Sequence, residues 1–275
     1  MSRDAARTDH ALAQRLERTE AAANAGFVEA RARVHPDHGS AWIEVGGTRA
    51  MYDGVDSPIT QTFGLGLFAP ITITDLDAIE SFFSARRAAT HHEVCPLSDP
   101  AHLVILSERG YRPIEQSTVL CQPLSLSASP TGRPGAGVTA RLMAPGEEDL
   151  WIDTSVAGWS SAPEFGAVIR GFAELMSKGG GATGFLAEIA GRAVATGALV
   201  LHDGVALLAG ASTVPAWRGR GAQTALLAAR LEYAAAKGAD LAMVVAMPGG
   251  QSQLNAERQG FRICYTRTKW GSRIP

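Results

Sequence analysis

Apolar positions along the chain follow two periods, one typical of helices and one typical of buried strands. Residues 205–213 are apolar almost throughout, which indicates a buried strand. Residues 224–237 are rich in Ala and Leu and are followed by Gly238, which predicts a helix with a glycine C-cap. An apolar stripe predicts a further helix at 11–33. Other helices are expected at 75–88, 100–109, 146–157 and 164–177, and other strands at 41–45, 49–53, 60–68, 92–97, 111–124, 183–189 and 192–201.

The order of these elements repeats once along the chain. A helix, a glycine, an aromatic residue and an arginine recur at Gly110 and at Gly260, an offset of 150 residues. Between the two copies, residues 125–137 are rich in Pro, Gly and Ser, which predicts a linker. The sequence therefore predicts a mixed α/β fold of the α+β type, with domains at 1–124 and 138–275.

Composition and charge exclude several classes of protein. Of the 275 residues, 46% are hydrophobic, and the formal net charge is −2 with no run of like charges. Binding to nucleic acid or to a membrane surface is therefore not expected. No apolar stretch approaches bilayer length, and the N-terminus has no apolar leader. Cys95, Cys121 and Cys264 are odd in number and far apart, so we expect buried thiols in a reducing compartment and no metal site. These features predict a cytoplasmic protein.

Residues 214–224 join the apolar strand to the following helix through a turn of Arg and Gly. They read Val-Pro-Ala-Trp-Arg-Gly-Arg-Gly-Ala-Gln-Thr. Small residues let backbone N–H groups point into a concavity at the helix N-terminus, where the helix dipole favours an anion. Arg218 and Arg220 add charges that phosphate oxygens would accept. The segment lacks the Gly-Lys-Ser/Thr of a P-loop, and Thr224 replaces the third glycine of a dinucleotide fingerprint. It predicts a phosphate-binding loop of another kind.

This segment resembles the acetyl-CoA pyrophosphate loop of the GNAT superfamily of N-acetyltransferases. That loop reads Arg/Gln-x-x-Gly-x-Gly/Ala after a strand that ends Val-x-Pro; Pro215, Arg218 and Gly221 match it, and Gln223 departs from it. The resemblance implies two tandem GNAT-like (acyl-CoA N-acyltransferase) domains around central mixed sheets, with acetyl-CoA (coenzyme A) as cofactor. The cofactor-binding residues that it implies are Ala211, Ser212, Thr213, Val214, Arg218, Gly219, Arg220, Gly221, Ala222, Gln223, Thr224, Ser252 and Asn255.

The first half of the chain lacks this loop. Under the offset of 150, residues 68–73 stand in the place of 218–223. Pro70 removes an amide donor, and neither Gly nor Arg is present, so a nest for pyrophosphate cannot form there. The resemblance therefore implies a degenerate N-terminal domain and a single cofactor site in the second half.

Acyl transfer from a thioester to an amine needs a proton acceptor, a stabilised oxyanion and a departing thiolate. By the resemblance, an amide of strand 205–213 faces the thioester oxygen. Glu188 is the candidate general base, although it is equally an exposed carboxylate on a strand. Ala256 stands where the family often has a tyrosine acid, so Tyr265 is the candidate acid. The other base candidates are His202, Asp203 and Glu257.

The leading interpretation is an acetyl-CoA-dependent N-acetyltransferase that acetylates the amine of a small molecule by direct attack in a ternary complex. Aromatic residues on the two helices at 146–177 either wall the acceptor site or form core; these are Trp151, Trp159, Phe165 and Phe172. Two alternatives stay open: a non-catalytic acyl-CoA-binding regulatory module, and a protein or peptide N-acetyltransferase. We expect a monomer or homodimer without nucleic-acid, membrane or metal partners.

Overall fold

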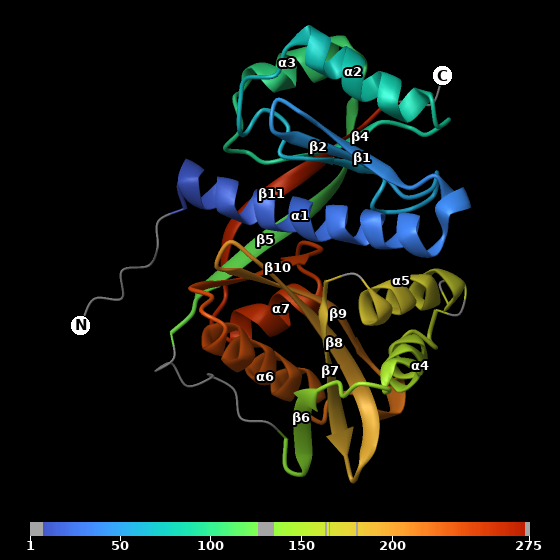
Figure 1. Cartoon of the computed structure of the whole chain (residues 1–275). Helices are drawn as coiled ribbons and strands as arrows, with labels where there is room; N and C mark the ends of the chain where they lie inside the picture. The colour runs from blue at the N-terminus through green and yellow to red at the C-terminus, as the bar shows by residue number, and fades with distance from the viewer. Residues whose placement is uncertain (1–7, 126–134, 163, 165, 180, 273–275) are drawn as a thin grey trace, which may run out of the picture. The chain divides into compact units, whose positions relative to one another are not determined.

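The computed structural model describes residues 8–125, 135–162, 164, 166–179 and 181–272. It divides into two units, each with its own strands and helices (Figure 1). The first unit comprises Met1–Leu120, Val245–Gly250 and Ile263–Pro275, and the second comprises Cys121–Val244 and Gln251–Arg262. Most of the linker predicted at 125–137 lies outside the described residues.

The first unit contains strands in the order β1, β2, β3, β4, β11, β5. Its strands are β1 (Ala41–Val45), β2 (Thr48–Tyr52), β3 (Gln61–Phe63), β4 (His91–Val94), β5 (Arg112–Pro123) and β11 (Arg262–Gly271), and its helices are α1 (His10–Val34), α2 (Ile73–Ser84) and α3 (Ala101–Glu108). β11 pairs antiparallel with β4, with Thr268 opposite Val94. On its other side, Lys269 Nζ lies 2.9 Å from Glu115 Oε2 of β5. The last strand of the chain thus belongs to the first unit.

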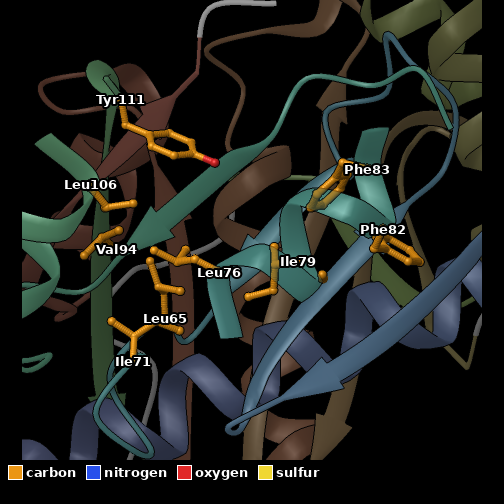
Figure 2. Close-up of a cluster of buried hydrophobic side chains, with 10 residues drawn as sticks. Leu65, Ile71, Leu76, Ile79, Phe82, Phe83, Val94, Leu106 and Tyr111 are labelled. Carbon is orange, nitrogen blue, oxygen red and sulfur yellow. The ribbon is translucent and has the colours of Figure 1, made fainter. Parts of the chain in front are cut away.

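The core of the first unit forms around α2. Leu76, Ile79 and Phe83, three and four residues apart, lie on one face of this helix and are fully buried. They belong to one cluster with Val94 of β4 and Leu106 of α3 (Figure 2). Burial of such side chains stabilises a fold by roughly 1.5–3 kcal/mol each.

The second unit contains strands in the order β10, β9, β8, β7, β6. Its strands are β6 (Val138–Leu142), β7 (Thr183–Ile189), β8 (Arg192–His202), β9 (Val205–Thr213) and β10 (Leu241–Ala246), and its helices are α4 (Glu148–Gly158), α5 (Gly166–Lys178), α6 (Ala222–Ala236) and α7 (Gln251–Arg258). β6 to β9 are antiparallel to one another, and β10 runs parallel to β9.

Helices cover both faces of this second sheet, with α4 and α5 on one side and α6 on the other (Figure 1). The alternation of side chains along β7 shows the same arrangement, because Leu186 packs against Trp151 of α4 and its neighbour Phe185 stacks edge-on with Tyr233 of α6. The indole Nε1 of Trp151 donates to the Phe185 carbonyl at 3.0 Å. Trp151 is thereby a core residue.

Three sequence expectations need correction. The strand expected at 60–68 ends at Phe63, because Gly64 and Gly66 adopt left-handed backbone at φ +79° and +66° and turn the chain. β6 had no counterpart among the predicted strands. Cys121 and Cys264 are disulfide-bonded, whereas Cys95 is a buried free thiol, so the cysteines no longer argue for a reducing compartment.

Among the described residues, no helix combines the length and the apolar character that crossing a bilayer requires.

Candidate functional site

The loop between β9 and α6 leaves the first amides of the helix open. It passes through a short 3₁₀ turn, η3 (Pro215–Trp217), and then through Gly219 and Gly221, whose φ angles are +75° and +86°. These angles favour glycine, because a Cβ is strained in the left-handed region. Gly221 is the N-cap of α6, and no side chain of the described residues caps this end. The N–H groups at the start of α6 are therefore available to an anion.

Two side chains of the loop bind it to its surroundings. Arg218 donates from Nη2 to the carbonyl of Gly158 at the end of α4 (2.8 Å) and from Nε to the carbonyl of Thr213 (3.2 Å). The amide Nε2 of Gln223 donates to the Ser212 carbonyl (3.0 Å) and to Thr213 Oγ1 (2.9 Å). Arg218 and Gln223 thus hold the loop against β9 and α4, and their phosphate contacts stay predictions.

The second arginine of the loop, Arg220, is exposed on its outer side. Its Cζ lies 4.8 Å from the ring centroid of Trp217, and the Cζ of Arg192 lies 5.9 Å from the same centroid. Guanidinium groups at these distances are attracted to the face of the indole. Arg220 and Arg192 therefore add exposed positive charge beside the loop, together with Arg218.

A bulge interrupts β9 before it reaches the loop. The register with β8 shifts between Thr196 and Ala198, so that Gly210 and Ala211 together face Gly197. Gly210 has a φ of +59°, and Gly210 and Ala211 are both exposed. A bulge of this kind turns backbone groups out of the ladder. Backbone amides at the middle of β9 can therefore meet a ligand.

β9 also loses its partner on the β10 side. The parallel pairing joins Leu241–Met243 to Val205–Leu207, and within the described residues of this unit it does not continue along 208–213. The side chain of Ser212 turns toward α4, where its hydroxyl donates to the Ser155 carbonyl at 3.1 Å. Because no described strand of this unit pairs with this edge beyond Leu207, the stretch 208–213 has backbone groups left for an extended ligand. This is the stretch that the sequence predicts to line the cofactor arm.

Glu188 lies at the end of β7, beside a cavity of about 490 Å³. The cavity is lined by Leu150, Asp153, Thr154, Ala157, Glu188, Gly191, Arg192, Ala193 and Val214. Arg141 Nη2 lies 2.6 Å from Glu188 Oε1, and the same guanidinium binds Glu147 at 2.6 and 2.8 Å. Hydrogen bonds from Arg141 lower the pKa of Glu147 to about 2. Glu188 is therefore tied to Arg141, which it shares with Glu147.

Comparisons with known proteins agree with this geometry. Residues 148–261 match the family model described as acetyltransferase (GNAT) family. This part of the chain is a GNAT acetyltransferase domain. No curated protein matches the sequence.

Solved structures extend the likeness over the whole chain. A GCN5-related N-acetyltransferase from Kribbella flavida has a TM-score of 0.64 and 20% identity, over 90% of this chain and 95% of that one. One from Sphaerobacter thermophilus has a TM-score of 0.60 and 17% identity, over 97% and 94%. A tandem GNAT protein from the clavulanic acid biosynthesis pathway has a TM-score of 0.62 and 14% identity, over 91% and 88%. These likenesses confirm the predicted tandem GNAT fold.

Tyr265 and the loop at residues 214–224 belong to different units. Tyr265 lies on β11 in the first unit, is buried, and donates its hydroxyl proton to Glu17 Oε1 at 2.9 Å. Burial and then the nearby Glu17 carboxylate raise the pKa of Tyr265 well above its usual value. Its role as an acid stays a prediction.

The remaining predicted residues lie at separate places in the second unit. Ser252 and Asn255 lie on α7, where Asn255 Oδ1 accepts from the Gln251 amide at 2.8 Å. Asp203 sits in the tight β8–β9 turn with φ +46°, next to His202 and at the end of β9 away from the loop. Glu257 is exposed on α7 and accepts from Gln253 at 3.2 Å.

The aromatic residues predicted beside the acceptor divide between core and surface. Trp151 is core, Trp159 is 41% exposed, and Phe172 is half-buried, whereas Phe165 lies outside the described residues. No group of three metal-ligating side chains gathers anywhere in the described part of the chain.

Sequence reasoning missed the bulge of the GNAT domain and the arginine beneath it, Arg230 of α6. Glycines inside a strand often mark bulges, so Gly197 and Gly210 were a usable signal. An arginine in the Ala- and Leu-rich stretch 225–236 was a second one, because charged residues are rarely buried unless paired.

Proposed function

We propose that the GNAT domain binds acetyl-CoA and transfers its acetyl group to the amine of a small molecule by direct attack in a ternary complex. The observation that carries this proposal is the start of α6, which no side chain of the described residues caps and which two left-handed glycines border. The stretch 208–213 of β9 leads to it, and its edge on the β10 side has no partner among the described strands of this unit. A pyrophosphate is the anion that such a helix start suits. The pantetheine arm would extend along 208–213 as an added strand partner.

The exposed bulge supports the second half of the proposal. When an amine attacks a thioester carbonyl, negative charge develops on the carbonyl oxygen, and a fixed backbone N–H at that point lowers the barrier. Gly210 and Ala211 present such backbone where the arm would end. We assign no tyrosine of the second unit as the acid that protonates the leaving thiolate. A thiolate of ordinary pKa can leave without such an acid, because water supplies the proton.

Titration with acetyl-CoA tests the loop, with two glycines as a matched pair. Gly219 and Gly238 both have positive φ, +75° and +84°, and a Cβ at either meets nothing within 4 Å. Both Gly→Val changes strain the backbone alike, and only the first alters the loop. We expect Gly219→Val to weaken acetyl-CoA binding about 100-fold or more, measured by calorimetry and by the ligand-dependent rise in Tm. Wild-type protein that shows no binding at millimolar acetyl-CoA would refute the proposal.

A second candidate is a non-catalytic acyl-CoA-binding module, and one observation favours it. Glu188, the predicted base, is tied to Arg141. Release of free thiol from acetyl-CoA across a panel of small amines, amino acids and peptides separates the two functions. Transfer to a small amine supports the enzyme, transfer only to peptides supports a peptide N-acetyltransferase, and tight binding without thiol release supports the module.

A further inference from the structure

A buried arginine without a carboxylate partner lies beneath the bulge of β9. Arg230 of α6 is 4% exposed. Its Nε donates to the Leu226 carbonyl at 3.2 Å, and its Nη1 donates to the carbonyls of Ala198 at 3.2 Å and Ala209 at 3.3 Å. Among the described residues it forms no ion pair, and burial alone lowers its pKa, to about 10. The guanidinium therefore remains a cation at neutral pH.

The two strands are shaped to admit this side chain. A Cβ at Gly197 would lie 2.9 Å from Arg230 Cζ, so only glycine leaves room for the guanidinium. Gly210, which forms the bulge opposite, has left-handed backbone and is packed from the other face by Met176 of α5. Two interior glycines and one long side chain thus converge on the same point of the sheet.

Stability alone does not account for a cation in this place. Burying a charged group without a counterion is unfavourable, and a well-packed apolar side chain of similar length is often as stable or more so. Arg230 gains three hydrogen bonds to neutral carbonyls, and the charge of the donor strengthens each of them. This offsets part of the desolvation and leaves a fixed positive charge behind the exposed bulge.

That charge acts on the backbone of the bulge. The carbonyl of Ala209 and the N–H of Gly210 belong to one peptide group. A cation that binds the carbonyl polarises the whole group and makes its N–H a stronger donor. Gly210, which carries this N–H, and the next residue, Ala211, are both exposed.

We propose that Arg230 is a positioning residue for acyl transfer: it fixes the bulge of β9 and strengthens the backbone donor that binds the thioester oxygen. This inference rests on the proposed function. In the reaction, the amine lone pair forms a bond to the thioester carbon, and the carbonyl π electrons move to the oxygen. The oxyanion then re-forms the carbonyl, the C–S bond breaks with its electrons on sulfur, and the amine proton passes to water. Arg230 acts while the charge is on oxygen, through the peptide that it holds.

The test is isotope-edited infrared spectroscopy of acetyl-CoA labelled with ¹³C at the carbonyl, bound to the full-length protein. A polarised carbonyl absorbs at lower frequency than the same group in water. We expect the band to move down on binding to wild type, and to return most of the way to its free position in Arg230→Met. Arg170→Met, which removes an exposed arginine of α5, is the control and should keep the wild-type band.

Kinetics give the second readout. We expect Arg230→Met to lower kcat with the accepted amine about 10- to 100-fold, while the dissociation constant of acetyl-CoA changes less than about threefold. A purely structural role would instead weaken cofactor binding and activity together. Arg230→Lys keeps the positive charge but loses the planar set of guanidinium donors. Its carbonyl band frequency and its kcat should therefore lie between those of wild type and Arg230→Met.

The outcomes separate the two proposals. Wild type that does not bind acetyl-CoA refutes the proposed function and this inference with it. Wild type that binds, with an unchanged carbonyl band in Arg230→Met, refutes this inference alone. If Arg230→Met does not fold, as judged by circular dichroism, the lysine variant decides in the same way.

Discussion

Two strand-to-helix corners, β3 to α2 in the first unit and β9 to α6 in the second, have the same place in the repeat and opposite chemistry. At the first corner, Thr72 and Asp75 form a capping box, in which Thr72 Oγ1 accepts from the Asp75 amide at 3.1 Å and Asp75 Oδ2 accepts from the Thr72 amide at 2.9 Å. The helix start thus has its own anion in the Asp75 carboxylate. At the second corner the N-cap is Gly221, and no side chain of the described residues caps the helix start.

The loops before the two helices differ in the same sense. Phe68 fills the first loop: a Cβ at Gly47 or at Gly64 would lie 2.5 Å from its side chain. From α1, Gln14 donates to the Leu67 carbonyl at 3.0 Å, and the guanidinium of Arg18 lies 4.6 Å from the Phe68 ring. The first corner is closed by groups of the chain itself, whereas the second is held at its sides by Arg218 and Gln223 and left open at the helix start. One fold can therefore serve as support or as a site, according to what occupies the helix N-terminus.

The two buried arginines show the same contrast. Arg267 of the first unit is 1% exposed and pairs with Glu20 at 2.6 Å and with Glu17 at 3.2 Å. Arg230 of the second unit has carbonyl partners and, among the described residues, no carboxylate partner. The buried arginine of the first unit is thus neutralised by carboxylates of its own unit, and that of the second unit is not.

The largest expected effect separates these arginines by stability. Arg267→Met removes the cation beside the buried Glu17 carboxylate and the partly buried Glu20 carboxylate, so we expect the free energy of unfolding to fall by about 3–5 kcal/mol. Arg230→Met leaves no buried carboxylate unpaired, and we expect a loss of less than about 2 kcal/mol. Urea denaturation followed by circular dichroism measures both. Equal losses, or a larger loss for Arg230→Met, would contradict the expectation that the carboxylate-paired arginine contributes more to the free energy of unfolding.

The next prediction converts the open corner into the closed one. Asp75 is the third residue of α2, and Thr224 is the third residue of α6. Thr224→Asp places a carboxylate where the pyrophosphate is proposed to bind, and Thr224→Asn is its uncharged match. We expect Thr224→Asp to weaken acetyl-CoA binding about 100-fold and Thr224→Asn less than about fivefold, measured by calorimetry. Similar affinities for the two variants would place the anion elsewhere.

The pH dependence of the free energy of unfolding tests the buried Glu17–Arg267 pair of the first unit. Burial raises the pKa of Glu17 above its usual 4.5, against the opposing effect of Arg267. Between pH 4.5 and the raised pKa, the folded state holds a proton at Glu17 that the unfolded chain has lost. The free energy of unfolding should therefore fall as the pH rises through this window, by up to about 1.4 kcal/mol per pH unit from this group. Comparing wild type with Glu17→Gln at several pH values measures this contribution; parallel pH profiles would contradict it.

Local pattern predicted some elements well because their signals are local. The helix expected at 224–237 is α6 at Ala222–Ala236, and the strand expected at 205–213 is β9. The strand expected at 60–68 stopped at Phe63, because two left-handed glycines outweigh an apolar run. No local signal shows that β11 pairs with β4, since a strand far along the chain finds that partner only through tertiary packing.

The site could be predicted only in part. The glycines of the loop have a backbone requirement that the sequence displays, and Gly219 and Gly221 have the left-handed φ that a concave loop needs. Side chains are different, because their partners come from distant segments. Arg218 reaches the Gly158 carbonyl, 60 residues away in sequence, and Arg230 reaches the Ala198 carbonyl, 32 residues away. Periodicity and spacing contain no information about such pairs.

The smallest expected effect concerns Gln223, the residue that departs from the family loop. Its amide joins the start of α6 to the end of β9 through Ser212 and Thr213. If this contact preorganises the loop, Gln223→Gly removes about 1 kcal/mol and weakens acetyl-CoA binding about fivefold. If the Gln223 amide instead competes with the cofactor arm for the Ser212 carbonyl, the same variant binds acetyl-CoA more tightly. Calorimetry on Gln223→Gly and Gln223→Ala decides between them. We expect weaker binding in both, because loss of this contact frees the start of α6 from the end of β9 and the loop is then less preorganised.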